Sequence, residues 1–347
     1  ILYVETPLSI LSPFKDKTLW YKWRLWRQGV RKLKDNLYLF SPPLLLPLAN
    51  RYRFINRINQ SLMACSLRKV CRQLSFKDPL LLTYLPNTAD MAGKLGEKLL
   101  IYDCVDEHSA FLGFNPELVR QMEIDLLQKA DLVFVTAQPL YDDKSQFTDN
   151  IHMLRNAADV ANFNLAMADD TVIPDDVKDI PGPVLGFIGR IKEWIDLELI
   201  KQVAEARPDW SIIMVGPVEL DADISQFSEL KNVHFIGSRA KEELPGYLKK
   251  FAVCLNPFRT SKLSNAVNPL KFYEYLAAGK PIVSTPMPEM DMLEGMVEIG
   301  EGRDEFIQAI ERALNDSPEK ITARLTLSQQ HSWEKRVEVM GDLIMQT

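Results

Sequence analysis

The sequence predicts an α/β protein built from two doubly wound domains. Short apolar, β-branched segments alternate with helix-length segments along the chain, as in successive βα units. The 347 residues, 46% hydrophobic and 25% charged, are enough for two separate cores. Between residues 168 and 183 an acidic stretch with three prolines breaks the alternation, which is typical of a linker. We therefore expect an N-terminal domain over residues 1–170, a linker over 171–183 and a C-terminal domain over 184–330.

Buried parallel strands are expected wherever a short apolar run is bounded by turn residues. Four of the last six such strands end in glycine, among them the strands that end at Gly189 and Gly216. A glycine there lets the backbone approach a ligand closely, although ordinary turn chemistry also explains one or two such glycines. In doubly wound sheets, ligands bind outside the carboxyl ends of the strands. The expected strands lie at residues 1–4, 36–40, 80–84, 99–103, 132–136, 151–154, 184–189, 211–216, 233–237, 252–256, 282–285 and 297–300.

A helix that begins near Asn268 and leads into a buried strand carries the strongest sign of a ligand site. Asn268 would cap this helix, with Pro269 at its first position and Gly279 just past its end. Lys271 and Glu274 share one face near the helix N-terminus, where backbone N–H groups and an ammonium attract phosphate. A carboxylate one turn further on can accept hydrogen bonds from two ribose hydroxyls. The segment favours a nucleotide diphosphate sugar; the alternative is a surface Lys–Glu pair on an ordinary amphipathic helix.

A cluster of titratable side chains follows the expected strand at residues 99–103. It contains Asp106 and His108 together with two further acidic residues. A carboxylate or imidazole at a strand end can take the proton from an acceptor hydroxyl. We expect Asp106 to act in this way, with His108 as the reserve because imidazole titrates near neutrality. The alternative is that Asp106 and Ser109 cap the next helix.

Residues 15–34 differ in composition from the rest of the chain. They hold eight basic residues, one acidic residue and three of the six tryptophans. Their charge is +7, and because the whole chain has net charge −6, the rest of the chain carries −13. Apolar residues recur at helical spacing and predict one helix with a basic flank. Such a helix suits an anionic membrane surface. The alternative is that its aromatic stripe packs on its own domain. Binding to nucleic acid is disfavoured because the remaining chain is acidic. The stripe consists of Trp20, Trp23, Trp26, Val30 and Leu33.

The helix from Asn268 resembles the donor-site helix of GT-B glycosyltransferases, in particular the retaining family 4 group. Glu274 matches the second position of that group's Glu-x7-Glu pair, whereas Ala266 stands at the first. Gly189 and Arg190 resemble the Gly-Arg of the family's first donor loop, where the arginine contacts the diphosphate. Some inverting GT-B enzymes instead use a lysine followed three residues later by a polar residue, and Lys271 with Glu274 also fits that pattern.

Two further stretches resemble this family. Residues 102–111 are similar to the same position in bacterial enzymes that assemble cell-surface polysaccharides of the teichuronic-acid type, which favours Asp106. Residues 130–163 resemble the end of the GT-B N-terminal domain, with Ala157 in place of a common glycine. In related proteins a strand, a glycine-containing loop and a helix precede the strand that opens this chain, so we expect a missing N-terminal piece. The family also implies that the last helix, within residues 331–347, returns to the first domain.

The resemblance implies a GT-B glycosyltransferase with two Rossmann-like domains. It would move a sugar from a nucleotide diphosphate donor to a hydroxyl of a glycan or lipid-linked acceptor in polysaccharide assembly. Arg190 and Lys271 would offset the charge of the departing diphosphate, so neither a metal nor another cofactor is expected. The alternatives are another nucleotide-sugar enzyme of this fold, such as an epimerase, and a binding or scaffold protein that has lost catalysis.

Other sequence features exclude competing classes. No strand is followed by GxGxxG and no GxxxxGK[ST] is present, which disfavours dehydrogenases and P-loop kinases. The Asp221-Ala-Asp223 spacing resembles a metal-binding DxD, but we interpret it as an acidic loop. Four scattered cysteines indicate neither a zinc site nor a disulfide framework. No apolar run is long enough to cross a membrane and no secretory signal is recognised, so we expect a cytoplasmic protein, either free or peripheral at the inner face of the membrane.

Overall fold

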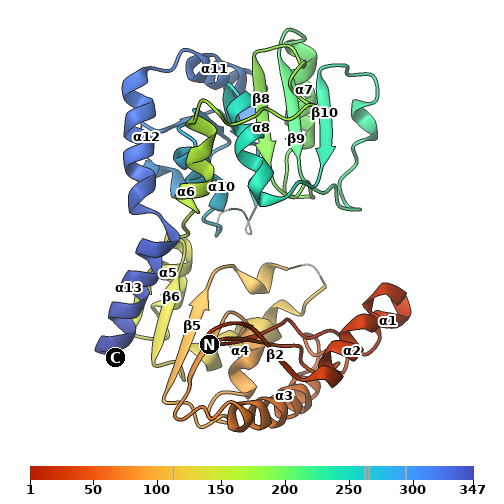
Figure 1. Ribbon diagram of the computed structural model, residues 1–347, viewed down its shortest axis with the longest axis vertical. Coiled ribbons are helices and arrows are strands. Elements are labelled where there is room, and N and C mark those ends of the chain that lie inside the picture. Colours follow the sequence, from red (N-terminus) through yellow and green to blue (C-terminus); the bar gives the residue numbers. More distant parts are fainter. Residues whose placement is uncertain (112, 262–263, 265, 294) are drawn as a thin grey trace. The chain divides into compact units, whose positions relative to one another are not determined.

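The structure is a computed structural model that describes all residues except 112, 262–263, 265 and 294. The chain forms two compact units. Residues 1–135, 140–152 and 347 make up the first unit, and residues 136–139 and 153–346 make up the second. Each unit is an α/β structure with parallel strands (Figure 1).

The first unit contains a three-stranded sheet of order β1-β3-β2 and a four-stranded sheet of order β4-β5-β6-β7. β2 runs antiparallel to β3, while β4, β5 and β6 pair in parallel. The strands are β1 Leu2–Val4, β2 Val30–Lys34, β3 Leu37–Phe40, β4 Leu80–Thr83, β5 Leu99–Cys104, β6 Leu132–Val135 and β7 Ile151–Met153. Its helices are α1 Ser12–Lys15, α2 Trp20–Gln28, α3 Arg53–Gln73, α4 Pro116–Leu127 and α5 Gln138–Lys144, with 3-10 turns η1 Lys17–Leu19, η2 Pro86–Asp90 and η3 His108–Ala110.

The single helix predicted across residues 15–34 is wrong in its second half. α2 ends at Gln28, and Gly29 takes the left-handed conformation with φ 74°. Val30–Lys34 then forms strand β2, which hydrogen-bonds to β3. Pairing with a neighbouring strand outweighs the helical spacing of the apolar residues, which periodicity alone does not reveal.

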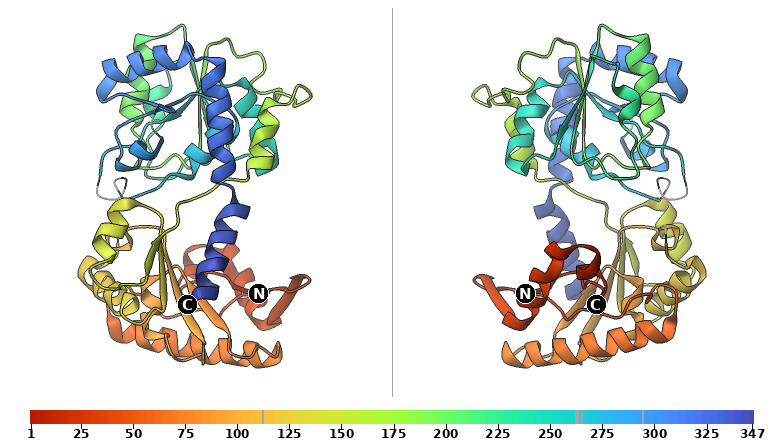
Figure 2. Two further views of the ribbon diagram at one scale, coloured as in Figure 1. Left: turned by 90° about the vertical axis from the view of Figure 1, so that its left-hand side faces the viewer. Right: turned by 90° about the vertical axis from the view of Figure 1, so that its right-hand side faces the viewer.

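The second unit is built on one six-stranded parallel sheet of order β10-β9-β8-β11-β12-β13. The order reverses between β8 and β11, which is the point where a doubly wound sheet opens a crevice for a ligand. Helices cover both faces of this sheet (Figure 2). The strands are β8 Val184–Ile188, β9 Ser211–Val215, β10 Val233–Gly237, β11 Val253–Asn256, β12 Ile282–Ser284 and β13 Val297–Ile299. The helices are α6 Val160–Asn164, α7 Leu197–Ala206, α8 Leu244–Lys250, α10 Leu270–Ala277, α11 Gly302–Leu314, α12 Pro318–Gln330 and α13 Trp333–Gln346, with 3-10 turns η4 Leu165–Met167, η5 Ser225–Phe227, η6 Lys241–Glu243 and η7 Pro288–Leu293.

The predicted fold class is confirmed, and every strand expected from the sequence is present within a residue or two. The compact units divide near residue 153, whereas the linker was expected at residues 171–183. That segment packs on the second unit, where Val177 is fully buried and Asp176 accepts a hydrogen bond of 2.7 Å from Arg239. Acidic composition and prolines therefore mark a loop wrapped on a domain here.

The final helical region is divided into two helices. α12 ends at Gln330 and α13 begins at Trp333. Between them, the backbone of His331 accepts from the Ala158 N–H at 2.9 Å, and the Trp333 N–H donates back to Ala158 at 3.2 Å. This tertiary bridge interrupts the helix. The expected return of the last helix to the first domain stays a prediction.

Candidate functional site

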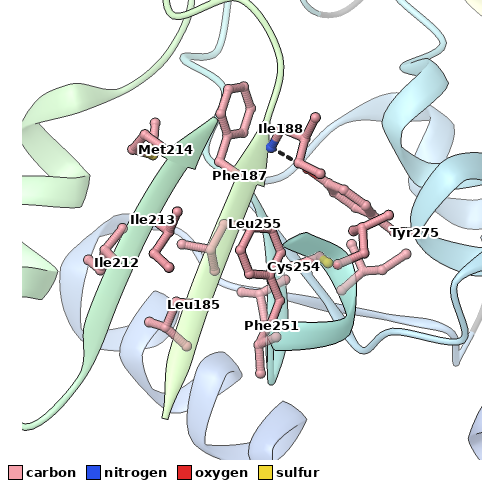
Figure 3. Close-up of a cluster of buried hydrophobic side chains, with 14 of the residues drawn as sticks. Leu185, Phe187, Ile188, Ile212, Ile213, Met214, Phe251, Cys254, Leu255 and Tyr275 are labelled. Atoms are coloured by element: carbon pink, nitrogen blue, oxygen red, sulfur yellow. Dashed lines mark hydrogen bonds between the residues drawn. The ribbon is translucent and has the colours of Figure 1, made fainter. Parts of the chain in front are cut away.

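Helix α10 is held against the carboxyl end of strand β8. The Ile188 N–H, at the end of β8, donates to the hydroxyl oxygen of Tyr275 at 3.0 Å, as the dashed line in Figure 3 shows. Tyr275 is fully buried, so this hydrogen bond satisfies an amide that would otherwise be an unpaired polar group in the core. The bond places the first turn of α10 beside the crevice where the strand order reverses.

The C-terminal end of α10 is fixed as well, and in the way that the sequence predicted. Gly279 has φ 65°, and the N–H groups of Gly279 and Lys280 donate to carbonyls of the last turn at 2.9 and 3.0 Å. This is a Schellman termination, which requires the left-handed conformation that glycine adopts most easily. The buried Arg324 of α12 donates to the Gly279 carbonyl at 3.2 Å and pairs with Asp316.

The predicted capping role of Asn268 is wrong. Pro269 occupies the N-cap position with an extended ψ of 122°, so α10 begins at Leu270 without a side-chain cap. The Asn268 side-chain oxygen instead accepts from the Asn156 N–H at 3.1 Å, and the Asn156 amide donates to the Asn268 carbonyl at 2.6 Å. Among the residues that the structure describes, no capping side chain therefore covers the amides of the first turn of α10. The place of Asn268 among the donor-binding residues stays a prediction.

Lys271 projects from this first turn, and no anionic partner is found for it among the described residues. Its side chain is half-buried, and its Nζ atom lies 5.4 Å from the ring centre of Phe187 and 5.7 Å from that of Phe258. Within the part of the chain that the structure describes, the ammonium makes no hydrogen bond and no ion pair. Burial lowers the pKa of Lys271, and the Glu274 carboxylate opposes that effect. A half-buried cation without a partner is expected to bind an anion from solution.

Two glycines shape the space around Lys271. Gly189 has φ 151°, and a β-carbon at this position would collide with Cε of Lys271 and lie 2.7 Å from Nζ. Gly216 has φ 145°, and a β-carbon there would collide with the carbonyl oxygen of Gly189. Both positions therefore need glycine for conformation; Gly216 also needs it for space, while a side chain at position 189 would displace the Lys271 ammonium. The structure brings Gly189, Gly216 and Lys271 together at one edge of the sheet, as the strand pattern predicted.

Glu274 is half-buried one turn after Lys271. Burial raises the pKa of the Glu274 carboxyl group, while Lys271 and Lys241 lower it. Among the described residues the carboxylate has no hydrogen-bond partner, and it forms no salt bridge with Lys271. The alternative of an exposed Lys–Glu pair is therefore wrong. Lys271 and Glu274 are instead two half-buried groups of opposite charge, and neither has a hydrogen-bond partner among the described residues.

The side chains of Arg190 and Lys192 interact with other residues of the second unit. The Arg190 side chain is exposed and forms an ion pair with Glu219. Lys192 lies over the Trp194 ring at 4.7 Å and is 3.9 Å from Asp221. Contact of Arg190 with a diphosphate stays a prediction, and it requires the guanidinium to leave Glu219.

We predict that Glu274→Gln weakens nucleotide binding mainly through the ribose. The amide keeps the size of the side chain but accepts hydrogen bonds less strongly than a carboxylate does. A ribose-containing nucleoside diphosphate should lose several-fold in affinity, whereas pyrophosphate should lose little. Calorimetry with both ligands measures the difference, and equal losses would indicate an effect on helix stability instead.

Asp106 and His108 lie in the first unit, after the carboxyl end of β5. The Asp106 carboxylate is half-buried and has no hydrogen bond or ion pair within the described residues. Burial raises the pKa of Asp106, while the charge of His108 acts to lower it. His108 is 5% exposed, its Nε2 atom has no partner there, and burial lowers its pKa. The capping alternative is wrong, because Glu107 caps η3 and Asn115 caps α4.

A buried charge network beneath this loop was not predicted. The fully buried Lys144 donates to Glu123 at 2.7 Å, Glu107 at 3.1 Å and Asp143 at 2.7 Å. Burial alone would lower the pKa of Lys144, but the carboxylates, Glu123 first among them, raise it overall. Because Glu107 precedes His108 directly, the network fixes the loop that carries both candidate catalytic residues. Glu123 and Lys144 are 21 residues apart in sequence, so their spacing gave no signal.

The Asp221-Ala-Asp223 motif has a local role. Asp223 accepts hydrogen bonds from the N–H and hydroxyl of Ser225 at 2.9 and 2.6 Å. Across the residues that the structure covers, no group of three or more His, Cys, Asp or Glu side chains is placed to hold a metal ion. None of the described helices is long and apolar enough to span a membrane.

The fold and the arrangement around α10 define a protein of the GT-B class. Sucrose-phosphate synthase from Thermosynechococcus elongatus has a similar structure, with TM-score 0.71 and 16% identity over 100% of this chain and 88% of that one. Anabaena Alr3699/HepE in complex with UDP-glucose is similar with TM-score 0.66 and 15% identity, covering 100% of this chain and 99% of that one. At these identities the likeness concerns the fold, and it confirms the GT-B expectation.

Sequence comparison finds a family match within the second unit. Residues 182–316 match the family described as glycosyl transferases group 1. The chain is also 30% identical over 237 residues to TuaH of Bacillus subtilis (strain 168), a protein assigned by name to teichuronic acid biosynthesis as a glycosyltransferase. The aligned region covers 63% of this chain and 59% of TuaH, so the chain spans less than two thirds of that relative. The resemblance to GT-B enzymes of the teichuronic-acid type is confirmed.

Proposed function

We propose that this protein is a glycosyltransferase that moves a sugar from a nucleotide diphosphate donor to a hydroxyl of a glycan or lipid-linked acceptor in polysaccharide assembly. The observation that carries the proposal is the unpaired, half-buried ammonium of Lys271 beside Gly189, at the point where the strand order reverses. A site of this kind suits a diphosphate. The HepE structures with UDP and UDP-glucose, and the name of TuaH, support the same class of donor and acceptor.

The chemistry follows from the charges available. The amides of the first turn of α10 and the Lys271 ammonium, joined by Arg190 if it leaves Glu219, would offset the negative charge of the leaving diphosphate. We propose that no metal or other cofactor takes part. Asp106 would take the acceptor proton or orient the hydroxyl, with His108 as the reserve.

Product release from a panel of nucleotide sugars tests this function. The protein is incubated with each donor, with and without glycan or lipid-linked acceptors, and the released nucleoside diphosphate and the sugar product are measured. Diphosphate release that requires an acceptor supports transfer. A change of the sugar without an acceptor would identify an epimerase, and no reaction with any pair would favour a binding protein.

The surface of residues 15–34 supports a peripheral location at the cytoplasmic face of a membrane. Trp20, Tyr21 and Trp23 of α2 are 45%, 47% and 38% exposed, whereas Trp26 and Val30 are half-buried and pack on the core of the first unit. The alternative of an aromatic stripe packed on its own domain thus holds for Trp26 and Val30. The exposed part of α2 suits an interface rich in anionic lipid.

We predict that exchanging Trp20 and Trp23 for serine reduces sedimentation of the protein with anionic vesicles. The wild-type protein should leave the vesicles as salt rises, because screening shortens the reach of its basic side chains. Vesicle sedimentation over a salt series measures both effects. Binding by the double variant equal to that of the wild type would show that α2 does not meet the membrane.

A further inference from the structure

Helix α3 has an outward face unlike that of an ordinary surface helix. Its 21 residues include five basic side chains and no acidic one. The inward face buries Met63, Ala64, Leu67 and Val70 in the core of the first unit. A surface helix normally carries mixed charge on its other side, so the absence of acidic residues here requires an explanation.

An apolar line runs along the outward face of α3. Phe54, Ile58 and Leu62 are 63%, 46% and 48% exposed. They are spaced four residues apart, so their side chains lie above one another along one side of the helix. The exposed Cys65 continues this line. Single exposed apolar residues are common, but an aligned row marks a contact surface.

Basic side chains accompany this row. Arg57, Arg68, Lys69 and Arg72 are exposed, whereas Arg53 turns to the first unit and bonds to Asp90 at 2.9 Å and Asp125 at 2.6 Å. Within the described part of the chain, Arg57 alone of the exposed four has a carboxylate within salt-bridge distance, Asp90 at 3.8 Å. The outward face of α3 is therefore an apolar row with four exposed cations and no acidic residue of its own.

We propose that the outward face of α3 lies on an anionic lipid surface, with the apolar row in the headgroup region and the four cations beside the lipid phosphates. Interfacial helices combine an apolar stripe with Lys and Arg in this way. Each basic residue near such a surface contributes about 1 kcal/mol. A second copy of the chain fits poorly, because a symmetric contact would place four cations opposite four cations. Nucleic acid would leave the apolar row without a partner.

The charge distribution along the chain agrees with this orientation. Residues 15–73 contain fourteen basic and two acidic residues, while the whole chain has net charge −6. This segment includes both α2 and α3, so two separate elements of the first unit would contact lipid. One weak contact gives marginal and reversible binding, whereas two together hold a protein at a membrane.

Binding of the full chain to vesicles tests the proposal, and the assay contains no donor or acceptor. A lack of vesicle binding would therefore contradict the membrane proposal without bearing on the proposed transferase activity. Vesicles of phosphatidylcholine are compared with an equimolar mixture of phosphatidylcholine and phosphatidylglycerol. We expect binding to the mixture only. Phe54→Ser, Ile58→Ser and Leu62→Ser combined should weaken it at least about tenfold, because the apolar row no longer enters the interface.

Charge reversal gives the second variant, with a matched control. Arg57→Glu, Arg68→Glu and Lys69→Glu combined should abolish binding, since each lost cation costs roughly fivefold in affinity. The control reverses three cations of the second unit with similar exposure, and it should bind as the wild type does. These are Lys178, Arg303 and Lys335, whose side chains are 51%, 52% and 53% exposed. Circular dichroism checks that each variant is folded.

A probe on Cys65 locates the contact. Cys104 and Cys254 are buried, so an environment-sensitive fluorophore attached in a Cys71→Ser background reports on the outward face of α3. We expect a blue shift on vesicles with phosphatidylglycerol. Sedimentation with vesicles without a blue shift would assign the membrane contact to another surface and overturn the proposal. Unchanged vesicle binding by both α3 variants would overturn it as well. A shift that depends on protein concentration without vesicles would assign this face to a second copy.

Discussion

Asp106→Asn is expected to lower turnover roughly 100-fold while donor affinity stays unchanged. The amide has the shape of the carboxylate but cannot accept the acceptor's proton. The Asp106 carboxylate is half-buried and has no hydrogen bond or ion pair among the described residues, so it can accept a hydrogen bond from an acceptor hydroxyl. Steady-state rates with saturating donor, together with calorimetry of the nucleoside diphosphate, measure the two quantities separately.

The pH profile gives this prediction a second readout. Burial raises the pKa of Asp106, so activity should fall as the pH drops through that raised value, which lies above the ordinary range of an aspartate. The asparagine variant should lack this acidic limb. Asp142→Asn, at an exposed carboxylate of the same unit, is the control and should keep full activity. An active Asp106→Asn protein would transfer the role to His108 or leave it unassigned.

Lys271→Ala is expected to weaken the binding of a nucleoside diphosphate about tenfold or more, as the loss of a charge-assisted contact does. The ammonium lies beside Gly189 over two aromatic rings, and no described residue neutralises it. Calorimetry with the free diphosphate measures the change. Lys231→Ala, at an exposed position of the same unit, should bind as the wild type does.

The affinity of the wild type should also depend on pH. Burial lowers the pKa of Lys271, so the cation is lost at a lower pH than for an exposed lysine, and nucleotide affinity should fall as the pH rises through that value. Lys271→Arg keeps its charge at all these pH values and should remove this dependence. Unchanged affinity in Lys271→Ala would exclude the phosphate role.

The sequence was most informative where burial is complete. Strands β8, β9 and β11 of the second unit are short, apolar and buried, so their positions were predictable from apolar runs alone. The end of α10 was predictable because Gly279 alone supplies the required backbone conformation. These features depend on neighbouring residues, which a single sequence shows directly.

Features that depend on contacts outside their own segment were not predictable. Helix α10 begins later than predicted because Asn268 hydrogen-bonds to Asn156, which is 112 residues away in the sequence. The helix after Trp20 stopped at Gly29 because Val30–Lys34 pairs with β3. The apolar row on α3 escaped notice because sequence periodicity does not tell an exposed apolar residue from a buried one. The deciding partner is Asn156 for the start of α10, the next strand along the chain for residues 30–34, and the solvent for the row on α3.

The two hydrogen bonds that hold α10 also bear on how a donor would bind. Tyr275 ties the helix to the end of β8, and Arg324 ties its other end to α12. The helix is thus preorganised, and a nucleotide bound at the proposed site would meet Lys271 and Glu274 without first ordering the helix that carries them, which would avoid an entropic cost of binding. Amide hydrogen exchange along α10 should already be slow before any ligand is present. If a closure accompanies the proposed transfer, we expect it to arise in segments other than α10, which these two hydrogen bonds hold in place.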